Sequence, residues 1–66
     1  MYLHQPEPLE KLKEALAEIR IKWATDYCWT YKYGKLHVLC NAVWVESIKE
    51  QATKCQVEID EILTYN

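Results

Sequence analysis

The chain has 66 residues, half of them apolar, with three Trp and five Tyr. At this length folding hides only about 60% of the surface that the unfolded chain exposes, so we expect a single small domain, 1–66. Eight basic and ten acidic residues give a formal charge of -2, which makes nucleic acid an unfavourable partner. The sequence has no run of about 18 apolar residues, so we expect no membrane partner.

The cysteine content indicates a reducing compartment. Cys28, Cys40 and Cys55 are odd in number and widely spaced, unlike the disulfide framework of small secreted proteins. Residues 1–8 lack the basic and apolar regions of a signal peptide. We therefore expect a cytoplasmic protein whose residues 1–7 form a flexible N-terminus.

A first helix is predicted over residues 8–24. Pro6 and Pro8 are typical of a helix start. Apolar residues then follow in steps of three and four: Leu9, Leu12, Leu16, Ile19 and Trp23. Residues 19–23 also alternate apolar and basic side chains as a strand does, and in that alternative the helix ends near Glu18 and a third strand joins the sheet.

A β-hairpin is predicted over residues 27–40, because the period changes to two and Gly34 marks a turn. A turn at residues 33–34 or at residues 34–35 gives the same two faces. One face, expected to lie against the helices or a partner, carries Trp29, Tyr31, Tyr33, Leu36, Val38 and Cys40. The other carries Cys28, Thr30, Lys32, His37 and Leu39.

A second helix is predicted over residues 43–63, with Asn41 as its N-terminal cap. Its apolar stripe consists of Val45, Ile48, Ala52, Cys55, Ile59 and Ile62. Glu58, Asp60 and Glu61 would lie at its C-terminal end, where the helix dipole disfavours negative charge. They are interpreted either as a solvated helix end or as an acidic contact surface. The predicted fold class is therefore α+β, in the order helix, β-hairpin, helix (α-β-β-α).

This order is superficially similar to that of the small docking domains of modular peptide and polyketide synthases. The segments that carry the similarity are residues 34–38, Gly-Lys-Leu-His-Val, and residues 57–63, Val-Glu-Ile-Asp-Glu-Ile-Leu. The similarity rests on apolar spacing, and residues 20–33 are longer than that pattern expects. It transfers no functional residue to this chain.

Two kinds of chemistry are disfavoured by the spacing. Zinc prefers thiolate and imidazole ligands, but no CxxC pair occurs, and strand alternation places Cys28 and His37 on the face opposite Cys40. A nucleophile pair of Cys28 and His37 would lie on a shallow hairpin that offers no oxyanion site. We therefore expect no metal, no cofactor and no enzymatic activity.

The surplus of aromatic residues favours a non-enzymatic protein-protein interaction module, an inhibitor or adaptor of the kind that phages and mobile elements encode. Its expected partners are a second copy of itself, as a homodimer, and another protein that the sequence does not identify. The predicted partner-binding residues are Trp23, Trp29, Tyr31, Tyr33, Trp44, Lys32 and Lys35, with Glu58, Asp60 and Glu61 as the acidic contact. One alternative is a nucleotide-like ligand in a pocket at a subunit interface, and another is single-stranded nucleic acid stacked on the rings.

Overall fold

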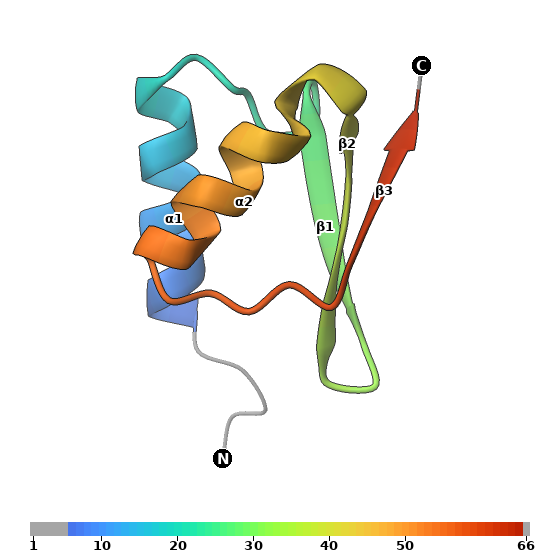
Figure 1. Ribbon diagram of the computed structural model, residues 1–66. Coiled ribbons are helices and arrows are strands. Elements are labelled where there is room, and N and C mark those ends of the chain that lie inside the picture. Colours follow the sequence, from blue (N-terminus) through green and yellow to red (C-terminus); the bar gives the residue numbers. More distant parts are fainter. Residues whose placement is uncertain (1–5, 66) are drawn as a thin grey trace.

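The computed structural model describes residues 6–65, which form two helices and a three-stranded sheet (Figure 1). The elements are α1 (Pro6–Glu18), β1 (Tyr27–Lys32), β2 (Lys35–Asn41), the short 3-10 helix η1 (Ala42–Trp44), α2 (Val45–Lys54) and β3 (Glu61–Tyr65). The α+β class is confirmed, but a third strand follows the second helix. Residues 1–5 of the predicted flexible N-terminus lie outside the described residues, and residues 6–7 belong to α1.

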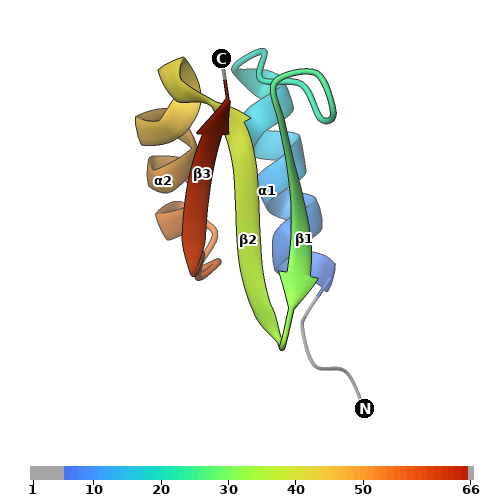
Figure 2. The same cartoon turned by 90° about the vertical axis from the view of Figure 1, so that its right-hand side faces the viewer.

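The sheet has the order β1-β2-β3, with β2 antiparallel to β1 and parallel to β3. The parallel pairing is possible because α2 carries the chain back to the end of the sheet at which β2 begins. Both helices cover the same face, so the described elements leave the opposite face of the sheet uncovered (Figure 2). Neither α1 nor α2 is long and apolar enough to cross a membrane.

The core lies between the sheet and the two helices. Its buried members are Leu9, Leu12, Leu16, Ile21, Tyr27, Leu36, Val38, Cys40, Ile48 and Ala52. These residues include three from the predicted stripe of the first helix and two from that of the second. Burial of each large aliphatic side chain contributes about 1.5 to 3 kcal/mol, which makes this contact the main source of stability.

The hairpin is confirmed, with a two-residue turn at Tyr33 and Gly34. Their φ angles are 55° and 75°, the positive values that the favoured two-residue hairpin turns require. Trp29 pairs with Val38 on the face that packs against the helices, as the alternation predicted. Tyr33 is the exception on that face, because it belongs to the turn and is 100% exposed.

The predicted first helix, 8–24, is wrong at its C-terminal end, because α1 ends at Glu18. The backbone N–H of Ile21 donates to the carbonyl of Leu16 over 2.9 Å, and Arg20 takes a φ of 71°. This left-handed residue with its backward hydrogen bond is the Schellman pattern that closes helices. This turn directs the side chain of Ile21 into the core, where Ile21 is 1% exposed.

The alternative helix end near Glu18 is therefore confirmed, but the strand that accompanied it is not. Residues 19–23 contain no strand, and Trp23 forms only an isolated bridge with Tyr27. Ile19 and Trp23, which a longer helix would have turned toward the core, are each 41% exposed. The third strand of the sheet comes from the other end of the chain.

The predicted second helix, 43–63, is wrong over its second half, because α2 ends at Lys54. The same closing pattern recurs, with Gln56 at a φ of 59° and the N–H of Val57 donating to the carbonyl of Ala52 over 2.8 Å. The chain then forms β3. The similarity to docking domains consequently ends at α2, because its closing segment is loop and strand.

Asn41 acts as a cap one element earlier than predicted. Its side-chain oxygen accepts a hydrogen bond of 3.1 Å from the N–H of Val43, at the start of η1, and α2 follows directly after Trp44. The apolar residues of the missing helical turns still contribute to the fold. Ile59 and Ile62 pack against the core from the loop and from β3.

Candidate interaction face of the sheet

Within residues 6–65, the uncovered side of the sheet carries three of the seven exposed large apolar residues. They are Leu39, Leu63 and Tyr65, with exposed fractions of 38%, 53% and 39%. Strand alternation and the pairing register define this side, here called the open face. The open face consists of Cys28, Thr30, Lys32, Lys35, His37, Leu39, Asn41, Glu61, Leu63 and Tyr65.

An apolar row crosses the middle of the open face. Leu39 on the central strand pairs with Cys28 on β1 and with Leu63 on β3. Side chains at directly opposite positions lie about 5 Å apart, so the three side chains form a continuous strip. Folding leaves this strip in contact with solvent, although its members are apolar.

Tyr65 borders the strip at one end. Its hydroxyl donates a hydrogen bond of 3.1 Å to the backbone carbonyl of Thr25, in the loop before β1. Loss of solvation, and secondly the nearby Asp26 carboxylate, raise the pKa of this hydroxyl above its usual value. The hydroxyl therefore remains a donor at neutral pH.

A group of three ionisable side chains borders the strip on the opposite side. His37 Nδ1 lies 3.2 Å from Glu61 Oε1, and His37 Nε2 lies 3.8 Å from Asp60 Oδ2. The N–H of Asp60 donates to the carbonyl of Leu36 over 2.8 Å, which fixes the entry into β3. This end of β3 therefore presents two carboxylates beside one imidazole.

The sequence-based placement of these acidic residues is wrong. Glu58 and Asp60 lie in the loop before β3 and Glu61 is the first residue of β3, so none of them lies at a helix C-terminus. The expected conflict with a helix dipole is absent, because α2 ends before them. Asp60 and Glu61 are brought together beside His37, and Glu58 instead lines a pocket.

Lys32 and Lys35 give the open face a positive corner next to the turn. They pair directly across the hairpin, where like charges repel each other. Within residues 6–65 neither ammonium group has a carboxylate within 4.0 Å. Lys32 lies on the outer strand β1 and Lys35 on the central strand β2, whereas the acidic group with Asp60 lies on the β3 side.

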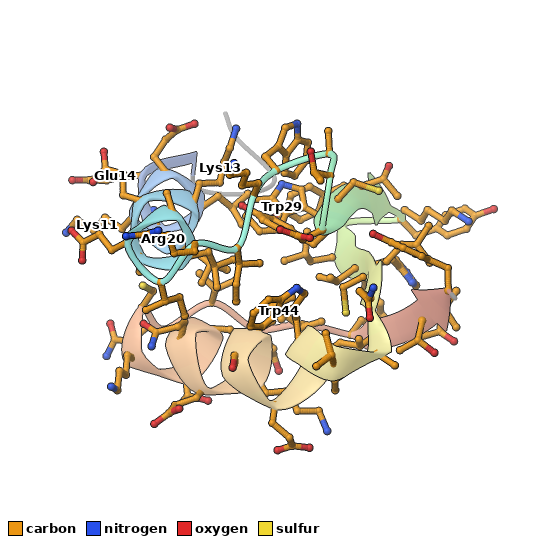
Figure 3. The ribbon with its side chains drawn as sticks, turned by 90° about the horizontal axis from the view of Figure 1, so that it is seen from above. Lys11, Lys13, Glu14, Arg20, Trp29 and Trp44 are labelled. Atoms are coloured by element: carbon orange, nitrogen blue, oxygen red, sulfur yellow. The ribbon has the colours of Figure 1, made fainter. Side chains whose placement is uncertain are left out.

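The aromatic residues predicted to bind a partner do not form one surface. Trp23 and Trp29 contact each other, with ring centroids 5.2 Å apart, and both contact Tyr27. The Lys13 ammonium lies 4.6 Å from the centre of the Trp23 ring. Figure 3 shows Lys13 and Trp29 on the same side of the molecule, with Trp44 apart from them beside α2.

Most of these rings face inward. Trp29, Tyr31 and Trp44 are half-buried against the core, whereas Tyr33 lies fully exposed at the turn. Burial raises the pKa of Tyr31. A surface made of all the predicted aromatics is therefore absent from the part of the chain that the structure describes.

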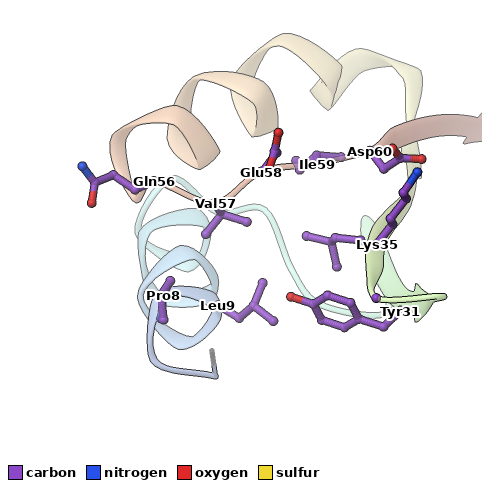
Figure 4. A pocket seen from close by; sticks show the side chains of 11 residues that line it. Pro8, Leu9, Tyr31, Lys35, Gln56, Val57, Glu58, Ile59 and Asp60 are labelled. Atoms are coloured by element: carbon purple, nitrogen blue, oxygen red, sulfur yellow. The ribbon is translucent and has the colours of Figure 1, made fainter. Parts of the chain in front are cut away.

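A pocket of about 640 Å³ lies between the start of α1, the hairpin end and the loop before β3 (Figure 4). Leu9, Val57 and Ile59 form part of its apolar lining, and Lys35 and Asp60 provide charged groups. It is formed within one chain, unlike the subunit-interface pocket of the ligand-binding alternative.

The predicted separation of the zinc-type ligands is confirmed. Cys28 and His37 lie on the open face, whereas Cys40 points to the core and is fully buried, which raises its pKa. In residues 6–65 no group of three or more His, Cys, Asp and Glu side chains is placed to hold a metal ion.

No known family model matches the chain. No curated protein and no solved structure shows significant similarity to it.

The hairpin alternation placed Leu39 on the correct face, but Leu63 was missed because it ended the predicted second helix, and Tyr65 was missed because no strand was predicted after that helix. A strand signal was present, since residues 62–65 include β-branched and aromatic side chains. The helical stripe that ends at Ile62 concealed it. The grouping of His37 with two carboxylates depends on the parallel pairing of β3 and had no local signal.

Proposed function

We propose that the protein is a non-enzymatic protein-interaction module that binds its partner through the open face. The observation that supports this most directly is the exposed apolar row of Cys28, Leu39 and Leu63, bordered by charged and polar groups. An apolar centre with a polar rim is the usual composition of a protein interface. The role is that of an inhibitor or adaptor, which acts by contact alone.

A reducing cytoplasmic setting belongs to the same proposal. Cys28, Cys40 and Cys55 are all free thiols, and Cys40 is buried without a partner sulfur. Thiols of this kind are typical of proteins in reducing compartments.

The alternative of binding single-stranded nucleic acid depended on aromatic rings that face solvent from the hairpin. Stacking of bases requires aromatic rings on a solvent-facing sheet, but Trp29 and Tyr31 pack against the helix side. The residues of β1 that reach the open face are Cys28, Thr30 and Lys32.

Photo-cross-linking from two positions tests the proposal. A benzophenone amino acid replaces Thr30, exposed on the open face, or Glu14, exposed on α1, in cells that produce the protein. We expect discrete protein adducts from position 30 and not from position 14, and loss of these adducts when Leu63→Lys is added. Equal adducts from both positions, or none from position 30, would refute binding through the open face.

A further inference from the structure

We infer that the occupant of the open face is a second copy of this chain, packed face to face about a two-fold axis that runs along β2. The inference rests on the proposed function of the open face and identifies its partner. Symmetric dimers use the same patch on both subunits, so the patch has to be complementary to itself. The open face meets this condition in its apolar row and in the charged groups of its two outer strands.

The strand order provides the geometry. Because β2 is central, a two-fold axis along β2 places β1 of one copy over β3 of the other. Sheets that pack face to face lie about 10 Å apart with strands within about 30° of alignment, which this axis allows. Each outer strand then covers the opposite outer strand of the second copy.

The apolar row becomes self-covering in this arrangement. Leu39 lies at the centre and meets Leu39 of the second copy. Cys28, on one side of it, meets Leu63 of the second copy, because the two residues occupy the same row on opposite outer strands. All three members of the strip are thereby removed from water.

The charges of the two outer strands become complementary in the same arrangement, whereas Lys35, on the central strand, meets Lys35 of the second copy. Lys32 lies on β1 at the turn end, and Glu61, with Asp60 before it, lies on β3 toward that end. Superposing β1 on β3 of the second copy brings Lys32 close to these carboxylates, and the symmetry makes two such contacts. The lysine that has no carboxylate within 4.0 Å in its own described chain acquires one. Opposed charges at the rim select this orientation over others.

The small size of the chain favours the same conclusion. A domain of this length has a small core and gains stability from association. Leu39 and Leu63, two of the large apolar residues that remain exposed on the sheet, are residues that the second copy would cover. A second copy is available in any cell that produces the chain. Its open face is the only additional surface that the contact requires.

The first experiment measures molar mass by sedimentation equilibrium in reducing buffer, from about 1 μM to about 1 mM. We expect a monomer-dimer equilibrium for the natural chain and a dissociation constant raised about tenfold or more by Leu63→Lys. Val43→Lys is the matched control, because Val43 is 70% exposed but belongs to η1 and not to the sheet. Circular dichroism checks that both variants keep the fold.

The second experiment tests the axis by exchanging charges. In Lys32→Glu alone and in Glu61→Lys alone, both rim contacts join like charges, so each variant dissociates more readily at low salt. In a mixture, each chain of one variant meets the complementary charge of the other. Native mass spectrometry of an equal mixture should therefore show a heterodimer well above the roughly one half expected for random pairing.

The outcomes separate the inference from the proposed function. A chain that stays monomeric at every concentration, while position 30 still forms adducts with a different protein, overturns the second copy and leaves the open face as an interface. Absence of every protein adduct from position 30 overturns both. A dimer that resists Leu63→Lys, or a mixture with random pairing, overturns the face or the axis; the charge variants also decide the question if Leu63→Lys fails to fold.

Discussion

The hydroxyl of Tyr65 donates a hydrogen bond to the backbone carbonyl of Thr25, which lies 40 residues earlier in the chain. Tyr65 ends β3 and Thr25 precedes β1, so the bond joins the two outer strands across the end of β2. β3 is mostly exposed and pairs with β2 alone. This contact therefore holds in place the strand that completes the open face.

Tyr65→Phe removes this hydrogen bond and keeps the ring. We expect the free energy of unfolding to fall, because the net contribution of one hydrogen bond is lost. Urea denaturation followed by circular dichroism measures it. Tyr33→Phe is the matched control, because Tyr33 is fully exposed at the turn, and it should leave stability unchanged. Equal effects of the two substitutions would show that the bond does not stabilise β3.

Gln56→Gly should stabilise the protein by about 0.5 to 1 kcal/mol. Gln56 follows α2 with a φ of 59°, a conformation that glycine adopts without a steric cost. The same change at Gln51, inside α2, should destabilise the protein by about 1 kcal/mol because glycine weakens helix interiors. Thermal unfolding distinguishes the two, and a loss of stability at position 56 would contradict the assigned helix end.

These helix ends explain which parts of the fold were predictable. The strand alternation around Gly34 gave the hairpin and its two faces, because period two and a turn glycine are local signals. Both helices instead close on left-handed residues that are not glycine, Arg20 and Gln56. With one glycine in the chain, the usual stop signal was missing. The apolar spacing continues past the ends of both helices. Both helices were therefore predicted too long, and β3, which follows the second helix, was not predicted.

The candidate site was less predictable than the fold for the same reason. An exposed Leu39 follows from the hairpin alternation, but its neighbour Leu63 becomes visible only once β3 is known. Tertiary packing decides between helix and strand for this segment, because Ile62 would face the core in either structure. An apolar pattern that fits both the helical period and the strand period does not determine which structure forms. Here the pairing with β2 determines it.

Trp23 and Trp29 should act on stability together. The hypothesis that they anchor a partner now competes with their mutual contact, in which the ring planes lie at 64° and the centroids 5.2 Å apart. A double-mutant cycle with Trp23→Ala and Trp29→Ala should give a coupling energy of about 0.5 to 1.5 kcal/mol in urea denaturation. Strictly additive losses would show that the edge contact contributes nothing, and the anchor hypothesis would regain support.

High pH should destabilise the protein through Tyr27. Burial, and secondly the charge of Glu10, raise its pKa from 10.0 to about 12. Because the folded state retains this proton more strongly than the unfolded state, the contribution to stability is complete below pH 10. It is lost as pH rises from 10 toward 12, with about 1 kcal/mol gone at pH 11.

Comparison with Tyr27→Phe isolates that contribution, because the variant keeps the buried ring and has no proton to lose at this position. Urea denaturation at pH 8 and at pH 11 should show that the natural chain loses about 1 kcal/mol more than the variant. The other titrating groups are common to both chains and cancel in the difference. An equal loss in both would mean that the Tyr27 hydroxyl titrates in the folded protein as it does in water.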